Sequence, residues 1–282
     1  RMVERKIFKT LMSSEDALIK LDKHCKIEPK EIEKRAILDS SGMIIADDIV
    51  SSLDVPNFDK ASMDGYAIVA SDTFGAKEDQ PIKLEITGVS QPGAPPSGTI
   101  NTGKAIEVGT GAPIPGGANS VVMVEYTQII NKELRVYRAV SPGENITPAG
   151  SDKRAGEIVL RKGQIISSRE IGVLAAIGLN KVPIYRKPKV AIISIGNELV
   201  KPGNVLEYAQ IFDINSNSVS ASVLENGGSP LNPVIVGDNK RIIKDAVISA
   251  LQEADIVLTS GSTSAGAGDI LNNVIEELGN PG

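Results

Sequence analysis

Three carboxylates in the last third of the chain, Glu198, Asp238 and Asp269, each follow a short apolar run. The segment before Asp269, residues 259–268, contains only Ser, Thr, Gly and Ala. Such a loop lets an anion approach the backbone N–H groups closely, and a helix that starts after it adds the positive end of its dipole. Carboxylate, water and phosphate oxygens are the ligands that Mg²⁺ prefers. The pattern therefore predicts a magnesium and phosphate site, although each carboxylate alone also fits an ordinary turn or helix cap.

These carboxylates lie together only if the apolar runs form one parallel sheet. Residues 190–195, 234–236 and 256–258 are predicted to be buried strands, and residues 216–226, 239–252 and 270–278 are predicted to be helices. Strands that alternate with helices imply a parallel sheet with right-handed crossovers. Ligands of such sheets bind outside the carboxyl ends of the strands, which is where Glu198, Asp238 and the small polar loop are expected.

The composition excludes several classes of function. His24 is the only histidine and tryptophan is absent, so histidine-based triads and histidine-rich metal sites are nearly ruled out. A net charge of −5 and a pI of about 5.2 argue against a nucleic-acid surface. The single Cys25 excludes an intramolecular disulfide and suits the reducing cytoplasm. No apolar run is long enough to span a membrane, and no segment has the pattern of a signal peptide.

The first two thirds of the chain predict mainly β-structure between two helices. Helices are expected over residues 14–22 and 166–177, and a strand is expected over residues 43–50. Residues 82–137 alternate short β-prone segments with Gly and Pro turns, which is typical of a compact all-β domain. Asp64 precedes Gly65, and this pair taken alone indicates a tight turn.

The segment around Asp64 resembles a family signature, Pro-x-Phe-x-x-Ser-x-Met-Asp-Gly-Tyr-Ala. This is the signature of the MoeA/gephyrin E-domain family of molybdopterin molybdotransferases. The positions of this chain that match it are Pro56, Phe58, Ser62, Met63, Asp64, Gly65, Tyr66 and Ala67.

Two further segments of the first two thirds extend the resemblance. Residues 109–115 are similar to the family's Met-Thr-Gly-Ala-Pro-x-Pro segment, with Gly109 in place of Met and with Thr110 retained. Asn119 replaces an Asp in the segment that follows. Residues 143–152 resemble the family's Gly-x-Asn-x-x-x-x-Gly-x-Asp segment, which places Asp152 at the family's acidic position.

The last third resembles the same family in three segments, residues 194–199, 211–215 and 259–269. The third segment departs from the family pattern at Ser262 and Ala267 and keeps Asp269. The family's sequence continues beyond the position of Gly282, through a Lys-Pro-Gly-Lys-Pro loop and a small β-domain. Lysines that bind anions in the family therefore have no counterpart in residues 1–282.

The resemblance implies a multidomain α/β plus all-β protein. We expect an elongated N-terminal or linker domain over residues 2–48 and 146–186 and a β-barrel-like inserted domain over residues 49–145. Residues 187–282 are expected to form a parallel three-layer α/β molybdopterin-binding domain that is incomplete at its C-terminal end.

The resemblance also implies an activity and the residues that perform it. The family inserts molybdate into adenylylated molybdopterin with release of AMP, depends on Mg²⁺, and works in the cytoplasm as a homodimer whose cleft is shared between subunits. The residues implied as catalytic are Asp64, Asp152 and Asp269, and the metal ligands are Glu198 and Asp269. The substrate-binding residues are expected to be Thr110, Asp238, Ser260, Gly261, Ser262, Ser264 and Gly266.

Two alternatives stay open at this point. The departures at Ser262 and Ala267 favour a non-catalytic pterin-binding or scaffold protein of the same fold. The sequence also leaves open whether molybdate or tungstate is the oxyanion. Neither reading involves nucleic acid or a membrane.

Overall fold

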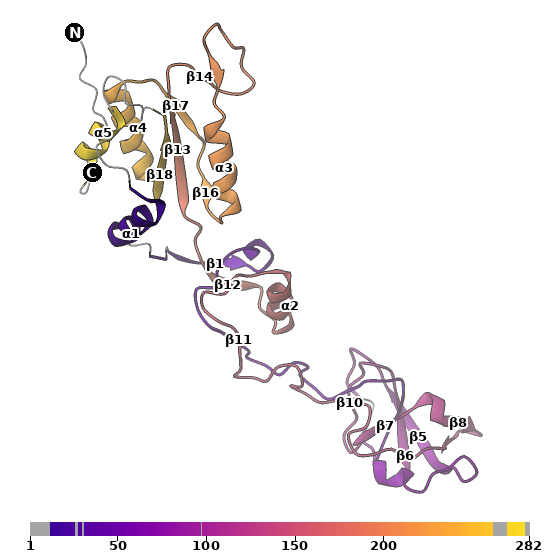
Figure 1. Cartoon of the computed structure of the whole chain (residues 1–282). Coiled ribbons are helices and arrows are strands. Elements are labelled where there is room, and N and C mark those ends of the chain that lie inside the picture. Colours follow the sequence, from indigo (N-terminus) through magenta and orange to yellow (C-terminus); the bar gives the residue numbers. More distant parts are fainter. Residues whose placement is uncertain (1–11, 26–27, 30, 97, 262–269, 280–282) are drawn as a thin grey trace, which may run out of the picture. The chain divides into compact units, whose positions relative to one another are not determined.

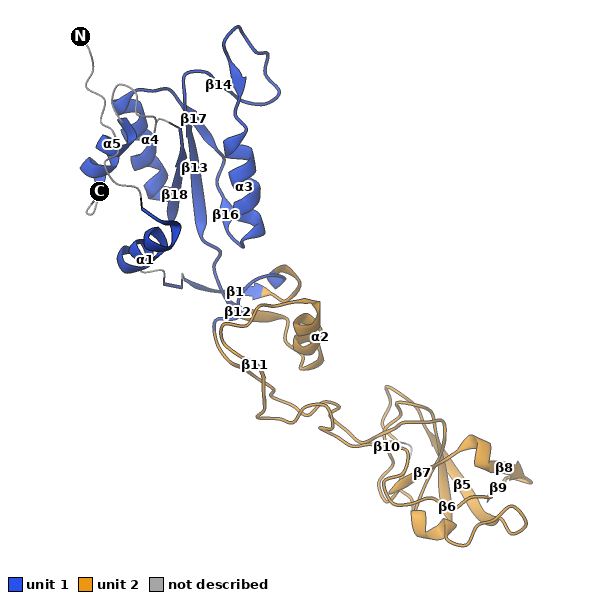
Figure 2. Ribbon diagram, in the orientation of Figure 1, with its two compact units in different colours: residues 1–35, 40–46, 183–282 blue, residues 36–39, 47–182 orange. Residues whose placement is uncertain are grey.

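The computed structural model describes residues 12–25, 28–29, 31–96, 98–261 and 270–279. The chain folds into two compact units (Figure 2). Unit 1 comprises residues 1–35, 40–46 and 183–282, and unit 2 comprises residues 36–39 and 47–182. No helix within the described ranges is long and apolar enough to cross a membrane. The division into three domains stays a prediction.

Unit 1 is built around a parallel sheet with β13 (Lys189–Ile195) at its centre. Strand β13 pairs in parallel with β16 (Ser229–Pro230), β17 (Val234–Val236) and β18 (Ile256–Ser260). Helix α3 (Asn215–Glu225) lies on one side of these strands, and α4 (Lys240–Glu253) and α5 (Ile270–Leu278) lie on the other (Figure 1). The predicted alternation of parallel strands and helices is confirmed.

Burial on both sides explains why β13 is almost entirely apolar. Every residue of the strand after Lys189 is buried, as expected for a strand of a parallel sheet that helices cover on both faces. The core between the sheet and α4 and α5 is formed by seven buried side chains: Ile193, Ile195, Val236, Ile243, Val247, Leu271 and Val274.

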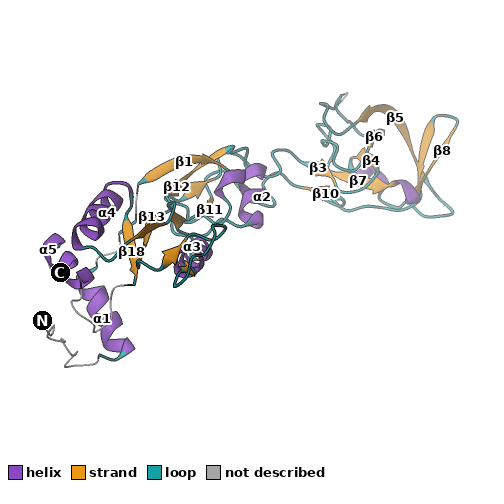
Figure 3. Ribbon diagram, turned by 90° about the horizontal axis from the view of Figure 1, so that it is seen from above, coloured by secondary structure: helices purple, strands orange, loops and turns teal. Residues whose placement is uncertain are grey.

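Charged groups connect the two helices on this side of the sheet, which lie next to each other (Figure 3). The Nζ atoms of Lys240 and Lys244 lie 2.5 Å and 2.9 Å from the two carboxylate oxygens of Glu277. Hydrogen bonds from both lysines lower the pKa of Glu277 to about 2. The carboxylate of Glu277 in α5 is therefore ionised at neutral pH and bridges two successive turns of α4.

A second ion pair fixes the start of β18. The guanidinium of Arg186 donates two hydrogen bonds to Asp255, at 2.8 Å and 3.0 Å. Asp255 also accepts a hydrogen bond of 2.7 Å from the backbone N–H of Lys189. Because Lys189 begins β13 and Asp255 precedes β18, this carboxylate aligns the first residues of the two strands.

The other elements of unit 1 are shorter or more exposed. They are α1 (Ser14–His24), β14 (Leu199–Val200) and β15 (Ile211–Phe212), of which the last two pair in parallel. The predicted N-terminal helix is confirmed as α1, and the hydroxyl of Ser13 accepts a hydrogen bond from the backbone N–H of Asp16 as its N-cap.

Unit 2 contains a mixed six-stranded sheet. In spatial order its strands are β7 (Ser120–Met123), β4 (Gly65–Ile68), β6 (Lys104–Val108), β5 (Ile82–Ser90), β9 (Glu133–Val136) and β8 (Thr127–Ile130). Three 3₁₀ turns, η1 (Leu38–Ser40), η2 (Ala70–Thr73) and η3 (Val124–Tyr126), and helix α2 (Ser168–Ala176) complete the larger elements of this part of the chain.

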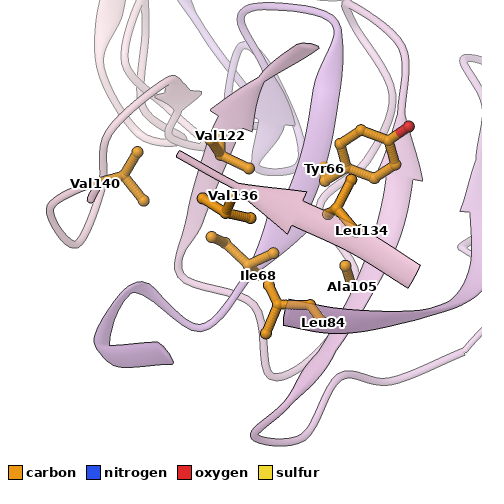
Figure 4. Close-up of a cluster of buried hydrophobic side chains, with 8 residues drawn as sticks. All are labelled: Tyr66, Ile68, Leu84, Ala105, Val122, Leu134, Val136 and Val140. Atoms are coloured by element: carbon orange, nitrogen blue, oxygen red, sulfur yellow. The ribbon is translucent and has the colours of Figure 1, made fainter. Parts of the chain in front are cut away.

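Strand β4 is buried on both faces of this sheet. Tyr66 and Ile68 belong to one cluster of buried apolar side chains, which also contains Leu134 and Val136 (Figure 4). The intervening Ala67 belongs to a second cluster. Because successive residues of a strand point to opposite faces, the alternation shows that the curled sheet has a core on either side of β4. The β-structure predicted for residues 82–137 is therefore confirmed, whereas a separate β-domain stays a prediction.

Three two-stranded pairs account for the remaining strands, and the first two are antiparallel. They are β3 (Lys60–Ala61) with β10 (Ile146–Thr147), β2 (Ile49–Val50) with β11 (Ile158–Leu160), and β1 (Ile32–Ala36) with β12 (Lys181–Tyr185).

The strand expected over residues 43–50 is mostly wrong, because only Ile49 and Val50 form β2. The chain changes its partner within this segment: Ile45 bridges to Ile184, whereas Ile49 pairs with Leu160. No continuous ladder can form across that change.

The close approach of β4 and β7 generates a stability prediction at Gly65. A Cβ atom at this position would run into the backbone carbonyl oxygen of Val122. Gly65→Ala should therefore lower the free energy of unfolding of unit 2 by about 3 kcal/mol, because neither strand can move without disturbing the core. Urea unfolding followed by fluorescence and circular dichroism measures this change.

The matched control is Gly172→Ala in the exposed face of α2, where a Cβ atom meets nothing within 4 Å. This change should raise stability by roughly 0.5–1 kcal/mol, since alanine is the better helix former. Equal effects of the two substitutions would contradict the packing argument.

Candidate functional site

The parallel register of unit 1 brings the predicted sheet-edge residues together. Ser194 of β13 pairs with Ser260 of β18, and Ile195 pairs with Val236 of β17. Beyond these strand ends the chain continues into Glu198 after β13, into Gly261 after β18 and into Asp238 after β17. Glu198, Asp238, Ser260 and Gly261 therefore all follow or end strands at the same edge of the sheet, as the sequence predicted.

Glu198 folds back over its own turn. A Cβ atom at Gly196 would lie 2.8 Å from both carboxylate oxygens of Glu198, so the absence of a side chain at Gly196 leaves the room that the carboxylate occupies. The side chain of Glu198 is exposed. The turn after β13 thus presents an accessible carboxylate at the sheet edge.

Asp238 is held through its backbone, while its side chain is exposed. The side-chain oxygen of Asn197 accepts a hydrogen bond of 3.2 Å from the backbone N–H of Asp238. This bond joins the turn after β13 to the turn after β17.

The carboxylate with the most hydrogen bonds at this edge is Asp213, which was not among the site residues predicted from the sequence. Its side chain is 1 % exposed. Its Oδ1 atom accepts hydrogen bonds from the Ser194 hydroxyl at 2.9 Å and from the backbone N–H of Ser216 at 3.1 Å. Its Oδ2 atom is buried and has no hydrogen-bond partner among the described residues.

Hydrogen bonding determines the charge of Asp213. Burial alone would raise the pKa of its carboxyl, but hydrogen bonds from Ser216, Ser194 and the Asn215 backbone outweigh burial and lower the pKa below its usual value. Asp213 is therefore ionised at neutral pH. The signal that could have identified it is its place in the segment 211–215, an acidic residue between apolar ones that also matches the family pattern.

Asn215 connects this network to the third strand of the edge. Its Nδ2 atom donates a hydrogen bond of 2.8 Å to the hydroxyl oxygen of Ser260. Ser260 acts as the acceptor in this bond, and its own hydroxyl hydrogen has no acceptor among the described residues. Ser194, Asp213, Asn215 and Ser260 thus form one polar group at the carboxyl ends of β13 and β18.

Unit 2 contains a separate group formed by Asp64 and Thr110. The Oδ1 atom of Asp64 accepts a hydrogen bond of 2.6 Å from the backbone N–H of Thr110 and one of 2.7 Å from its hydroxyl. These two hydrogen bonds hold the pKa of the Asp64 carboxyl below its usual value. Strands β4 and β6 make the contact possible, because Gly65 pairs with Val108.

Asp152 also lies in unit 2 but has different neighbours. Its backbone N–H donates a hydrogen bond of 2.9 Å to the carbonyl oxygen of Val55, and its side chain is exposed. The described contacts of Asp152 do not include Asp64 or Thr110. The grouping of Asp152 with Asp64 stays a prediction.

Four predicted site residues lie outside the described residues: Ser262, Ser264, Gly266 and Asp269. Among the described residues there is no group of three or more His, Cys, Asp or Glu side chains that could hold a metal ion alone. The accessible carboxylate of Glu198 fits Mg²⁺ as one ligand among several, since Mg²⁺ is commonly held by one or two carboxylates together with substrate phosphates and water.

Two family descriptions match this chain. Residues 12–178 match "MoeA N-terminal region (domain I and II)", and residues 191–282 match "Probable molybdopterin binding domain". The first match alone covers more than half of the chain.

Individual relatives agree with these matches. The chain is 35 % identical over 240 residues to the molybdopterin molybdenumtransferase of Nostoc sp., covering 85 % of this chain and 55 % of that protein. It is 34 % identical over 253 residues to the molybdopterin molybdenumtransferase of Bacillus subtilis, covering 88 % and 59 %. The chain therefore spans less than two thirds of the length of these curated relatives.

A solved structure extends the agreement to the fold. The crystal structure of the molybdopterin biosynthesis MoeA protein from Pyrococcus horikoshii superimposes with a TM-score of 0.82 and 37 % sequence identity, covering 93 % of this chain and 66 % of that one. The sequence segments, the fold and the family matches agree, and the chain belongs to the MoeA family.

Proposed function

We propose that this chain acts as a molybdopterin molybdotransferase, which inserts molybdate into adenylylated molybdopterin and releases AMP. The observation that carries the proposal is the polar group of Ser194, Asp213, Asn215 and Ser260 at the carboxyl ends of β13 and β18. It lies in the segment that matches a molybdopterin-binding domain. The relatives named as molybdenumtransferases support the reaction class.

The free hydrogen-bonding groups of this edge suit a pterin that carries a phosphate. The hydroxyl hydrogen of Ser260 has no acceptor among the described residues and can be donated to a ligand, whereas Oδ2 of Asp213 is buried. The ring N–H and amino groups of a pterin are donors, whereas its phosphate oxygens are acceptors. The negative charge of Asp213 disfavours a purely anionic ligand at this edge.

The remaining edge residues complete the proposed substrate site. Backbone and hydroxyl groups of the loop that starts at Ser260 and Gly261 and contains Ser262, Ser264 and Gly266 hold pterin and phosphate, and Asp238 borders them. Glu198 and Asp269 hold Mg²⁺, which neutralises phosphate charge when bound. Positioning and charge stabilisation, more than a strong base, supply the rate.

We propose that Asp64, Thr110 and Asp152 approach this site from the β-domain of a second copy, in a cytoplasmic homodimer. The proposal rests on the resemblance to the family, whose cleft is shared between subunits. We further propose that the complete molybdopterin-binding domain is a parallel three-layer α/β structure and that an elongated linker domain connects it to a β-barrel-like domain.

Glu198→Gln tests the metal assignment. The change preserves the volume of the side chain but removes its charge, so folding should persist while Mg²⁺ affinity falls and Mg²⁺-dependent turnover drops by roughly 10- to 100-fold. Calorimetric titration with Mg²⁺ and turnover of adenylylated molybdopterin with molybdate or tungstate measure the two effects.

The matched control is Glu207→Gln, in an exposed loop of the same unit. It should change neither quantity. Unchanged Mg²⁺ binding in Glu198→Gln would reject the role of Glu198 as a ligand. Unchanged turnover in Glu198→Gln would reject the metal assignment at this position.

Asp64→Asn separates chemistry from binding. Asparagine favours the same turns and can still accept hydrogen bonds from Thr110, so the melting temperature should stay the same. Loss of a positioned catalytic carboxylate should lower turnover about 10²–10⁴-fold, while binding of adenylylated molybdopterin changes little. Thermal unfolding, calorimetric binding and single-turnover kinetics are the three measurements.

Near-normal turnover of this variant would return Asp64 to the role of a turn residue. Lost binding with intact folding would instead make Asp64 a recognition residue.

Light scattering tests the shared cleft. A protein that forms its site from two copies should have twice the mass of one chain at micromolar concentration. A monomer with full turnover at the same concentration would reject the proposal that two copies share the site.

A further inference from the structure

We propose that Thr110 is a positioning residue that acts through Asp64 and does not itself bind the substrate. This inference rests on the proposed function for the importance of Asp64, and it changes the role expected of Thr110 from the sequence. The contact that carries it is the pair of hydrogen bonds, 2.6 Å and 2.7 Å long, from Thr110 to Oδ1 of Asp64.

Both hydrogen-bond donors of Thr110 are used in this contact. A threonine has one backbone N–H and one hydroxyl hydrogen to donate, and its remaining groups can only accept. Molybdate and phosphate oxygens are acceptors, so they require donors from the protein. Thr110 cannot donate to such an anion while it holds Asp64.

Backbone hydrogen bonds fix both partners. The carbonyl oxygen of Asp64 accepts a hydrogen bond of 3.2 Å from the N–H of Val124. On the other side, the N–H of Gly111 donates to the carbonyl oxygen of Ala61 at 2.8 Å, and the N–H of Ala112 closes a turn on Gly109 at 2.9 Å. The position of Thr110 relative to Asp64 is therefore set by the sheet and not by chance contact of two mobile side chains.

The consequence for Asp64 is that its two carboxylate oxygens differ. Oδ1 accepts both hydrogen bonds, while Oδ2 has no protein donor within the described residues and is free to face a reactant. The two hydrogen bonds from Thr110 lower the pKa of Asp64 and outweigh the effect of burial, which raises it. Thr110 thus fixes the orientation of the carboxylate and favours its charged form.

The test compares Thr110→Val, Thr110→Ser and Thr87→Val with the wild-type chain. Valine has nearly the shape of threonine but no hydroxyl, whereas serine keeps the hydroxyl. Thr87 lies on β5 of the same sheet, and its hydroxyl donates to the Ala105 carbonyl oxygen, so Thr87→Val is a matched loss of a hydroxyl away from Asp64.

The first readout is independent of turnover. Selective ¹³C labelling of aspartate carboxyls, with Asp64→Asn to assign the signal, gives the titration midpoint of Asp64 in the full-length chain. Hydrogen bonds to the charged form lower a pKa, so Thr110→Val should move the midpoint to higher pH. Thr110→Ser should keep it low, and Thr87→Val should leave it unchanged. An unchanged midpoint in Thr110→Val would overturn the inference.

The second readout is the division between kcat and KM. Misplacement of a catalytic group can cost up to about 100-fold, so Thr110→Val should lower kcat roughly 10- to 100-fold with little change in KM, and Thr110→Ser should restore most of kcat. The acid limb of the pH–turnover profile of Thr110→Val should also move to higher pH, in the same direction as the titration midpoint of Asp64. Weaker binding of substrate with unchanged kcat would show that Thr110 contacts the substrate, which overturns the inference.

The two readouts distinguish this inference from the proposed function. A wild-type chain without turnover would contradict the proposed function, and the carboxyl titration alone would then decide whether Thr110 controls Asp64.

Discussion

The parallel pairing of β13 with β17 and β18 is the constraint on which the candidate site of unit 1 depends. It places the carboxyl ends of three strands at one edge, with Ser194 beside Ser260 and Ile195 beside Val236. Because helices cover both faces of β13, a polar side chain near the end of the strand has little access to water. Such a group costs free energy unless it is hydrogen-bonded, and Ser194 meets this requirement through Asp213.

Most elements of unit 1 could be predicted from the sequence because each is marked by a short pattern of neighbouring residues. Apolar runs identified the strands, and the cap at Ser13 was visible as a serine before acidic residues. In unit 2 the capping box of α2 is also a local feature, since Ser167 and Glu170 are three residues apart. The convergence of the strand ends followed from the rule for parallel sheets, which needs only the alternation of elements.

Asp213 was not selected because its role depends on a contact across the sheet. Its hydrogen bond to Ser194 joins residues 19 positions apart, and its burial follows from packing that no periodicity describes. The strand over residues 43–50 failed for a related reason. Met43, Ile45, Ala46 and Ile49 are buried, but the change of partner between Ile45 and Ile49 is a property of the tertiary fold that no local pattern describes.

The link between Asp64 and Thr110 was likewise hidden in the sequence, since the two residues are 46 positions apart. A hydroxyl in a loop that matches a family segment indicates a binding residue when it is considered alone. The hydrogen bonds to Asp64, which the pairing of β4 with β6 makes possible, show that both of its donors are already used. The structure therefore changes the role that we expect of Thr110, while the residue stays important to the proposed site.

The two carboxylates that the structure defines best, Asp64 and Asp213, reach the same charge state in opposite environments. Asp64 is exposed and one residue supplies both of its hydrogen bonds, whereas Asp213 is buried and its donors are spread over several residues. In both cases hydrogen bonding lowers the pKa, so both are acceptors at neutral pH and neither stores a proton for the reaction. In the site that we propose, these two negative charges require positive charge or donor groups to offset repulsion of an anionic substrate. This requirement favours the proposed reaction by charge stabilisation and precise placement, with the proposed Mg²⁺ at Glu198, over proton transfer from these carboxyls.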